Sequence, residues 1–136
     1  MRMLTGLRDI VILAALAAVT GCKTSSDDAL VFHNQREVLT SSQLNELTSK
    51  ANAGDSAASY RVYEYYEYVA GNYPTAERWV MKSAEQGSPN GQYTYGLLLF
   101  QRSDEQSKQQ GIAWLKKAAA NGIKLAAEVL AQNGIK

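Results

Sequence analysis

Residue types that carry chemistry or crosslinks are scarce in this 136-residue chain, which has one cysteine, one histidine and two prolines. A single cysteine cannot form an intrachain disulfide, so we expect packing alone to hold the fold. The one histidine, His33, has no nearby nucleophile, and few zinc ligands remain besides carboxylates. A glycine-rich phosphate loop and a Gly-x-Ser-x-Gly turn are also missing. We therefore expect a protein that is not an enzyme and that holds no metal or other cofactor.

An excess of charge of one sign is missing as well. The chain has 14 basic and 13 acidic residues and a formal net charge of +1. Removing residues 1–21 would take away two arginines and one aspartate and leave a net charge of zero. Binding to nucleic acid needs clustered lysine and arginine, so we expect no nucleic-acid partner.

No apolar run in the sequence is long enough to span a membrane. The N-terminal run, Ile10–Val19, would form about 15 Å of helix, which is half of a bilayer core. It follows a short basic head, Met1–Arg8, so we interpret residues 1–21 as a signal peptide. The next residues, Val19-Thr20-Gly21-Cys22, resemble the bacterial lipobox.

The lipobox resemblance implies a lipid-anchored protein. In that family the peptide is cut before the cysteine, whose thiol and new amine are acylated, with palmitate among the chains. Cys22 would carry this anchor, and Lys23, where an inner-membrane signal has Asp, implies the outer membrane facing the periplasm. We interpret residues 22–40 as the lipidated cysteine and a flexible tether. Leu30–Phe32 within it could pack on the domain or contact a partner.

A nine-residue segment that begins at Trp79 returns in similar form at Trp114, 35 residues later. The copies share the tryptophan, a lysine, a central alanine and a closing glycine. Gly54, Gly87 and Gly122 close three such segments. A period in this range is typical of stacked helical hairpins, which present surfaces more often than they perform chemistry.

The small and bulky residues that follow these glycines, together with the tryptophan-centred helix, resemble the Sel-one-like repeat family, short relatives of the tetratricopeptide repeat. The resemblance covers residues from about 44 to 134. It implies an all-α fold, a right-handed α/α solenoid of antiparallel hairpins in a domain at residues 41–136. We predict six helices in the order second, first, second, first, second and first helix of a repeat, at about 41–52, 55–70, 75–86, 89–101, 105–120 and 123–133.

Local signals agree with these helix boundaries. Thr40–Gln43 has the pattern of a capping box. Pro74 and Pro89 stand where first turns are expected, and Ser103–Gln106 can start the fifth helix. The closing glycines suit helix ends that need a left-handed residue. Both tryptophans are predicted to pack within their repeats, and Lys116-Lys117 to form a solvated face.

Five of the eight tyrosines lie between positions 60 and 68. At 100° per residue, Ala58, Val62, Tyr65, Tyr66 and Val69 share one face, which matches the core positions of the family. The opposite face is rich in tyrosine and glutamate, as protein interfaces often are. It comprises Tyr60, Tyr63, Glu64, Glu67 and Tyr68.

In tetratricopeptide-like solenoids the first helices line a concave groove. The resemblance thus adds Tyr93, Leu97 and Phe100 of the second repeat to this candidate partner-binding surface, which would suit a helix or loop with basic residues. The same tyrosine face could instead pack against a neighbouring repeat. Glu64 and Glu67 imitate a catalytic carboxylate pair only superficially, because no base or nucleophile accompanies them.

Small lipoproteins with such repeats include immunity proteins that neutralise toxins in the periplasm, among them phospholipases delivered by type VI secretion. The resemblance therefore implies a protein partner and, through acyl chains, a membrane. We expect an immunity protein. The alternatives are an envelope scaffold or adaptor that assembles a membrane or secretion complex, and an accessory module for a hydrolase or for peptidoglycan.

Overall fold

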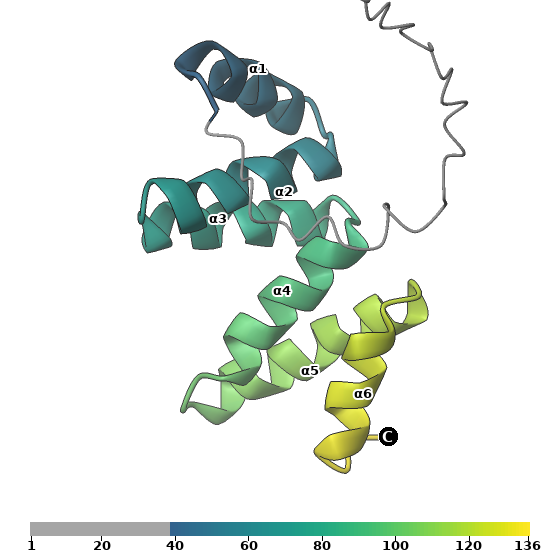
Figure 1. The fold of residues 1–136 in the computed structure, drawn as a ribbon. Coiled ribbons are helices and arrows are strands. Elements are labelled where there is room, and N and C mark those ends of the chain that lie inside the picture. Colours follow the sequence, from purple (N-terminus) through teal and green to yellow (C-terminus); the bar gives the residue numbers. More distant parts are fainter. Residues whose placement is uncertain (1–38) are drawn as a thin grey trace, which may run out of the picture. The chain divides into compact units, whose positions relative to one another are not determined.

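The computed structural model describes residues 39–136, and the signal peptide, Cys22 and most of the tether lie outside the described residues. The described part is all-helical, with six α-helices, one π-helical turn and no strand (Figure 1). No helix in residues 39–136 is long and apolar enough to cross a membrane. The elements are α1 Ser41–Asn52, α2 Ser56–Glu64, η2 Tyr65–Val69, α3 Tyr73–Glu85, α4 Pro89–Phe100, α5 Glu105–Ala120 and α6 Lys124–Gln132.

Successive helices pair as antiparallel hairpins, as predicted. Near one end of the α4–α5 pair, Asn121 Nδ2 donates to Gln92 Oε1 at 2.8 Å. At the other end the backbone of Gly111 lies against that of Phe100. The α2–α3 pair follows the same rule, because Ser59 contacts Gln86 while Tyr63 packs against Ala76. The fold is therefore a short helical repeat.

A glycine in the left-handed region ends each second helix of a repeat. Gly87 closes α3 with φ +93° and Gly122 closes α5 with φ +92°. The amide after each glycine, of Ser88 or Ile123, donates back across the helix end at 3.0 Å to the carbonyl of Ser83 or Ala118. This bond pattern defines the Schellman motif, and it confirms the predicted left-handed helix ends.

Equivalent side-chain hydrogen bonds tie the end of each second helix to the first helix of the same repeat. Gln86 accepts from the hydroxyl of Ser59 and donates to the Ala51 carbonyl at 2.8 Å. Asn121, 35 residues after Gln86, makes the corresponding bond to Gln92. Ser59 is completely buried, so its hydroxyl needs this partner.

The helix starts carry side-chain caps. Thr40 and Gln43 form the predicted capping box, and Asp104 caps α5 through the amide of Ser107 at 2.8 Å. This bond holds the pKa of Asp104 below its ordinary value. Pro74 and Pro89 lie in the first turns of α3 and α4, as expected, although α3 begins two residues earlier than predicted, with Asn72 as its N-cap.

The core consists of three small clusters rather than one large one. One joins α1 to α2 through Ala51, Ala58 and Val62, and another joins α2 to α3 and α4. Trp79 packs against both, which confirms its predicted packing role. The third cluster holds α4, α5 and α6 around buried Leu115, Ala118, Ala126 and Leu130.

The end of the second predicted helix departs from the regular α pattern. From Tyr65 the chain forms a π turn, in which the amide of Ala70 donates to the Tyr65 carbonyl at 2.9 Å. Each π turn holds one more residue than an α turn, so the faces assigned at 100° per residue no longer apply after Tyr65. Val69, predicted as a core residue, is consequently 40% exposed.

We expect Gly111→Ala to destabilise the protein, although alanine favours an isolated helix by about 1 kcal/mol. The added Cβ would lie 2.5 Å from the Phe100 amide nitrogen and 2.7 Å from the Gly96 carbonyl oxygen. Overpacking of this kind lowers the free energy of unfolding by about 1–3 kcal/mol, measurable by urea denaturation. Gln110→Ala, at the exposed neighbouring position, is the control. A gain of stability in Gly111→Ala would contradict the close approach of α4 and α5.

We expect Gln86→Ala to lower the free energy of unfolding by about 2–3 kcal/mol, because it leaves two largely buried polar groups without partners. These groups are the Ser59 hydroxyl and the Ala51 carbonyl. Gln132→Ala on the exposed surface of α6 is the matched control. Equal urea midpoints for the two variants would show that the interhelical bonds contribute nothing.

Candidate protein-binding face

Helix α2 and turn η2 position the tyrosine-rich stretch. The carboxylate of Asp55 caps α2 by accepting from the amides of Ala57 and Ala58 at 3.0 and 2.9 Å. Val62 is completely buried, and Tyr66 packs against two core clusters, as predicted for that face. The residues predicted for the opposite face, Tyr60, Tyr63, Glu64, Glu67 and Tyr68, lie in the same α2–η2 stretch, and we call them the acidic tyrosine face.

The aromatic rings of this face form a chain. The centroids of Tyr60 and Tyr63 lie 5.3 Å apart, and those of Tyr63 and Tyr68 lie 6.2 Å apart in an edge-to-face arrangement. Tyr63, predicted as a partner contact, is only 4% exposed and packs against Ala76 and Val80 of α3. Tyr63 is buried because α3 crosses α2 at Tyr63 and covers its side chain. Tyr63 therefore supports the face from beneath.

The hydroxyl groups of the face are held in place. The Tyr60 hydroxyl forms a 3.1 Å hydrogen bond with Thr94 of α4, and that of Tyr63 bonds with Tyr68. Burial raises the pKa of Tyr60 above its ordinary value, although the bond from Thr94 opposes the shift. Burial, followed by the bond with Tyr68 and the charge of Glu67, raises the pKa of Tyr63 far above its ordinary value.

The two carboxylates of the face differ in their partners. Glu64 accepts from the Arg61 guanidinium at 3.2 Å, and its side chain is 24% exposed. Glu67 is also partly buried, but within residues 39–136 it has no ion pair and no side-chain hydrogen bond. Its charge lies close enough to affect the ionisation of Tyr63.

The sequence interpretation missed two residues that extend this face at its edge. Val69 and Tyr73 are 40% and 64% exposed and follow closely in the chain after Tyr68, which is 49% exposed. Helical periodicity could not indicate them, because η2 and the turn at Gly71 both interrupt it. Together they give the acidic tyrosine face an apolar margin.

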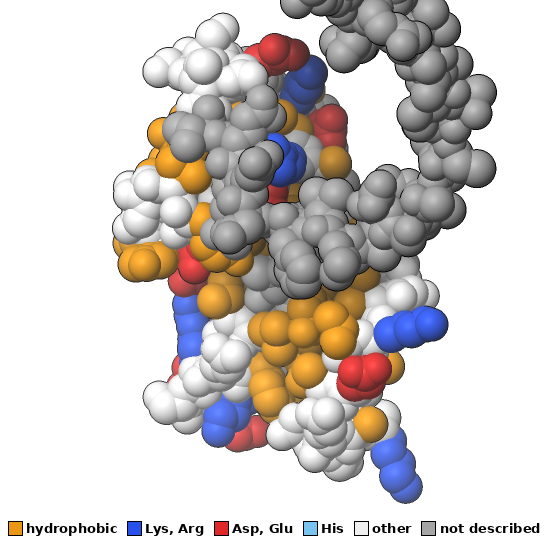
Figure 2. Space-filling view, viewed as in Figure 1, with side chains coloured by type: hydrophobic (Ala, Val, Ile, Leu, Met, Phe, Trp, Pro, Cys, Tyr) orange, Lys and Arg blue, Asp and Glu red, His pale blue; other side chains and the backbone are white. Residues whose placement is uncertain are grey.

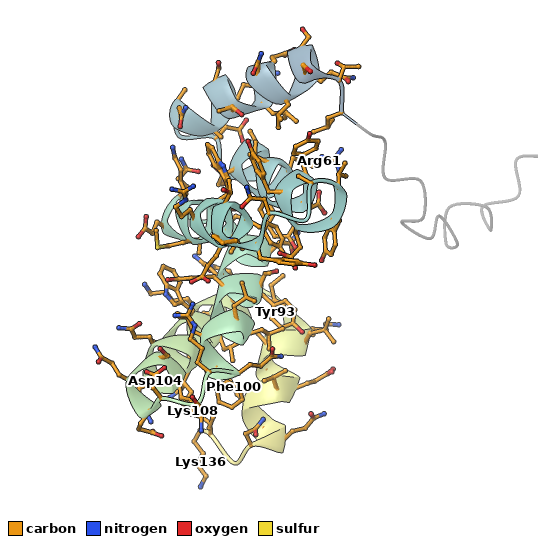
Figure 3. The ribbon with its side chains drawn as sticks, turned by 90° about the vertical axis from the view of Figure 1, so that its left-hand side faces the viewer. Arg61, Tyr93, Phe100, Asp104, Lys108 and Lys136 are labelled. Carbon is orange, nitrogen blue, oxygen red and sulfur yellow. The ribbon has the colours of Figure 1, made fainter. Side chains whose placement is uncertain are left out.

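The three predicted contact residues of the second repeat lie on a different part of the surface. Tyr93, Leu97 and Phe100 are partly buried and pack against the cluster of α4, α5 and α6. Figure 3 shows Tyr93 and Phe100 along α4, apart from Arg61 on α2. Hydrophobic side chains gather between α4 and α6 in Figure 2. The bond from Tyr60 to Thr94 joins this part to the acidic tyrosine face.

The surface of the second helices carries the repeated tryptophans. Lys82 lies over the ring of Trp79 at 5.0 Å, and Lys117 lies over Trp114 at 4.2 Å. Lys82 also donates to Asn52 at 2.6 Å, in a shallow hollow between α1 and α3. These repeated pairs are cation–π contacts within one helix.

Among the described residues, no three His, Cys, Asp or Glu side chains lie close enough together to hold a metal ion. Cys22 and His33 lie outside the part that the structure describes.

The sequence is similar to the uncharacterized protein YibG of Escherichia coli K12, with 33% identity over 88 residues. The match covers 62% of this chain and 58% of YibG, so it spans little more than half of that relative. No family model and no solved structure matches the chain. The name of the relative assigns no activity.

Stability should fall at alkaline pH in a way that depends on Tyr63. A tyrosine whose pKa is higher in the folded than in the unfolded protein stabilises the fold fully below the unfolded pKa of about 10. This contribution is lost as the pH rises from there toward the folded pKa. We expect the free energy of unfolding to drop above pH 10, and to drop less steeply in Tyr63→Phe. Urea denaturation at several pH values from about 8 to 11, on both sides of the tyrosine pKa of about 10, measures the free energy of unfolding of both proteins. Equal slopes in the two proteins would contradict the assignment.

Proposed function

We propose that the chain is a non-catalytic protein-binding lipoprotein, and specifically an immunity protein that binds and neutralises a secreted toxin such as a type VI phospholipase. In this proposal acyl chains on Cys22, a residue outside the described part, hold it at the outer membrane facing the periplasm. The observation that supports a binding role is the exposure of three large apolar side chains, Tyr68, Val69 and Tyr73, within seven residues of chain that also hold Glu67.

The composition of the face favours recognition of a protein. Tyrosine supplies a large contact area for few rotatable bonds, and it is enriched at protein interfaces. The rings of Tyr60 and Tyr68 are already fixed through contacts with Tyr63. Because little side-chain freedom remains to be lost, such a face binds at a lower entropic cost.

The type of partner follows from the resemblance to Sel-one-like lipoproteins and is the less supported part of the proposal. An immunity protein must bind one toxin tightly, with nanomolar affinity or better. The envelope scaffold, the second candidate, would bind several partners at micromolar affinity. The fixed and partly buried tyrosines favour one matched partner, because a rigid face adapts poorly to several.

The test is a growth competition with the full-length, lipidated chain. We expect a deletion strain to be killed by neighbouring cells that deliver the toxin, and the wild-type gene to rescue it. The double variant Tyr68→Ala/Tyr73→Ala should fail to rescue, because truncation of interface tyrosines commonly costs more than 1 kcal/mol each. Leu125→Ala, at a residue 56% exposed on α6, is the control and should rescue. Survival of the deletion strain beside armed cells would contradict the immunity role.

A further inference from the structure

The carboxylate of Glu67 stands out among the charged groups of the described residues. Three carboxylates there, those of Glu46, Glu64 and Glu77, form ion pairs with Lys50, Arg61 and Arg102. Glu67 is partly buried and has no such pair and no side-chain hydrogen bond. A carboxylate that has lost part of its hydration without gaining a cation is a site of unmet charge.

Within residues 39–136, Glu67 acts on a tyrosine and pairs with no cation. Tyr63 and Tyr68 lie beside it, and the charge of Glu67 contributes to the raised pKa of Tyr63, after burial and the bond with Tyr68. Arg61, the one cation in the sequence from Tyr60 to Val69, is paired with Glu64. The negative charge of Glu67 therefore remains available to a ligand.

The neighbouring carboxylate shows which cation fits this surface. The guanidinium of Arg61 lies 3.2 Å from Glu64 although the Arg61 side chain is 52% exposed. A guanidinium matches a carboxylate with two parallel hydrogen bonds and can also stack on an aromatic ring. Tyr68 and Tyr73, 49% and 64% exposed, offer such rings at the edge of the face.

We infer that the acidic tyrosine face receives an arginine side chain of the protein partner, with Glu67 as the acceptor of its guanidinium and the ring of Tyr68 beside it. The inference rests on the proposed binding function and specifies its chemistry. Arginine suits the position better than lysine, because lysine presents a single point charge that cannot use both the carboxylate and the ring plane.

A peptide of six arginines tests this without knowledge of the partner. We expect its binding to the full chain, followed by NMR chemical shifts at low salt, to perturb the resonances of Glu67 and Tyr68. Glu67→Gln should weaken binding about tenfold, as expected for loss of a charge-assisted hydrogen bond. Glu128→Gln removes the same charge from an exposed position on α6 and should change the affinity less than twofold, roughly the effect of a screened surface charge.

The other outcomes are equally informative. A peptide of six lysines should bind more weakly than the arginine peptide, and equal binding would overturn the preference for a guanidinium. Equal losses in Glu67→Gln and Glu128→Gln would overturn the site. Far-ultraviolet circular dichroism and urea midpoints of both variants should equal those of the wild type, so that weakened binding cannot be attributed to unfolding.

Failure of this inference can be distinguished from failure of the proposed function. If Glu67→Gln rescues the deletion strain as well as the wild type while Tyr68→Ala/Tyr73→Ala does not, the face binds its partner without an arginine at Glu67. If the arginine peptide binds as expected but the deletion strain survives beside armed cells, the arginine site at Glu67 is supported and the immunity role is contradicted.

Discussion

The fold depends on how each second helix of a repeat ends. A left-handed glycine turns the chain into the next helix, and the residue before it reaches back to the first helix of the same repeat. Gly87 with Gln86 does this for α3, and Gly122 with Asn121 does it for α5. One short segment thus fixes both the packing within a hairpin and the direction of the next one. Because the end of each helix sets the direction of the next one, a change at one helix end would displace all the helices that follow.

The acidic tyrosine face is a consequence of this arrangement. The α2–α3 crossing buries Tyr63, and the buried ring then holds Tyr60 and Tyr68 in place. The π turn brings Val69 to the surface, and Tyr68 and Tyr73, before and after it in the chain, are exposed as well. Structural and exposed tyrosines are therefore parts of one cluster, with the core supporting the surface that we propose to be functional.

Much of the fold could be predicted because its signals are local. The capping box at Thr40, the glycine ends and the repeated tryptophans each depend on a few neighbouring residues. The assignment of faces was reliable in α2, where Val62 is buried as predicted; in the π turn Tyr66 still packs on the core, but Val69 at its end does not. Tyr63 was misplaced for another reason, since the position of α3 over α2 is not visible in the pattern of α2 alone.

The sequence by itself determined the helices, their ends and their order, because capping, left-handed glycine and helical periodicity act over a few residues. The ion pair of Glu64 belongs to this local part, because Arg61 stands three residues before it, where side chains of one helix meet. Glu67 stands six residues after Arg61, beyond the reach of such a pair, and its charge acts instead on Tyr63, which is buried only because α3 crosses α2 there. The tertiary structure alone decided which residues of the tyrosine-rich stretch are buried, because α3 covers Tyr63 and the π turn exposes Val69.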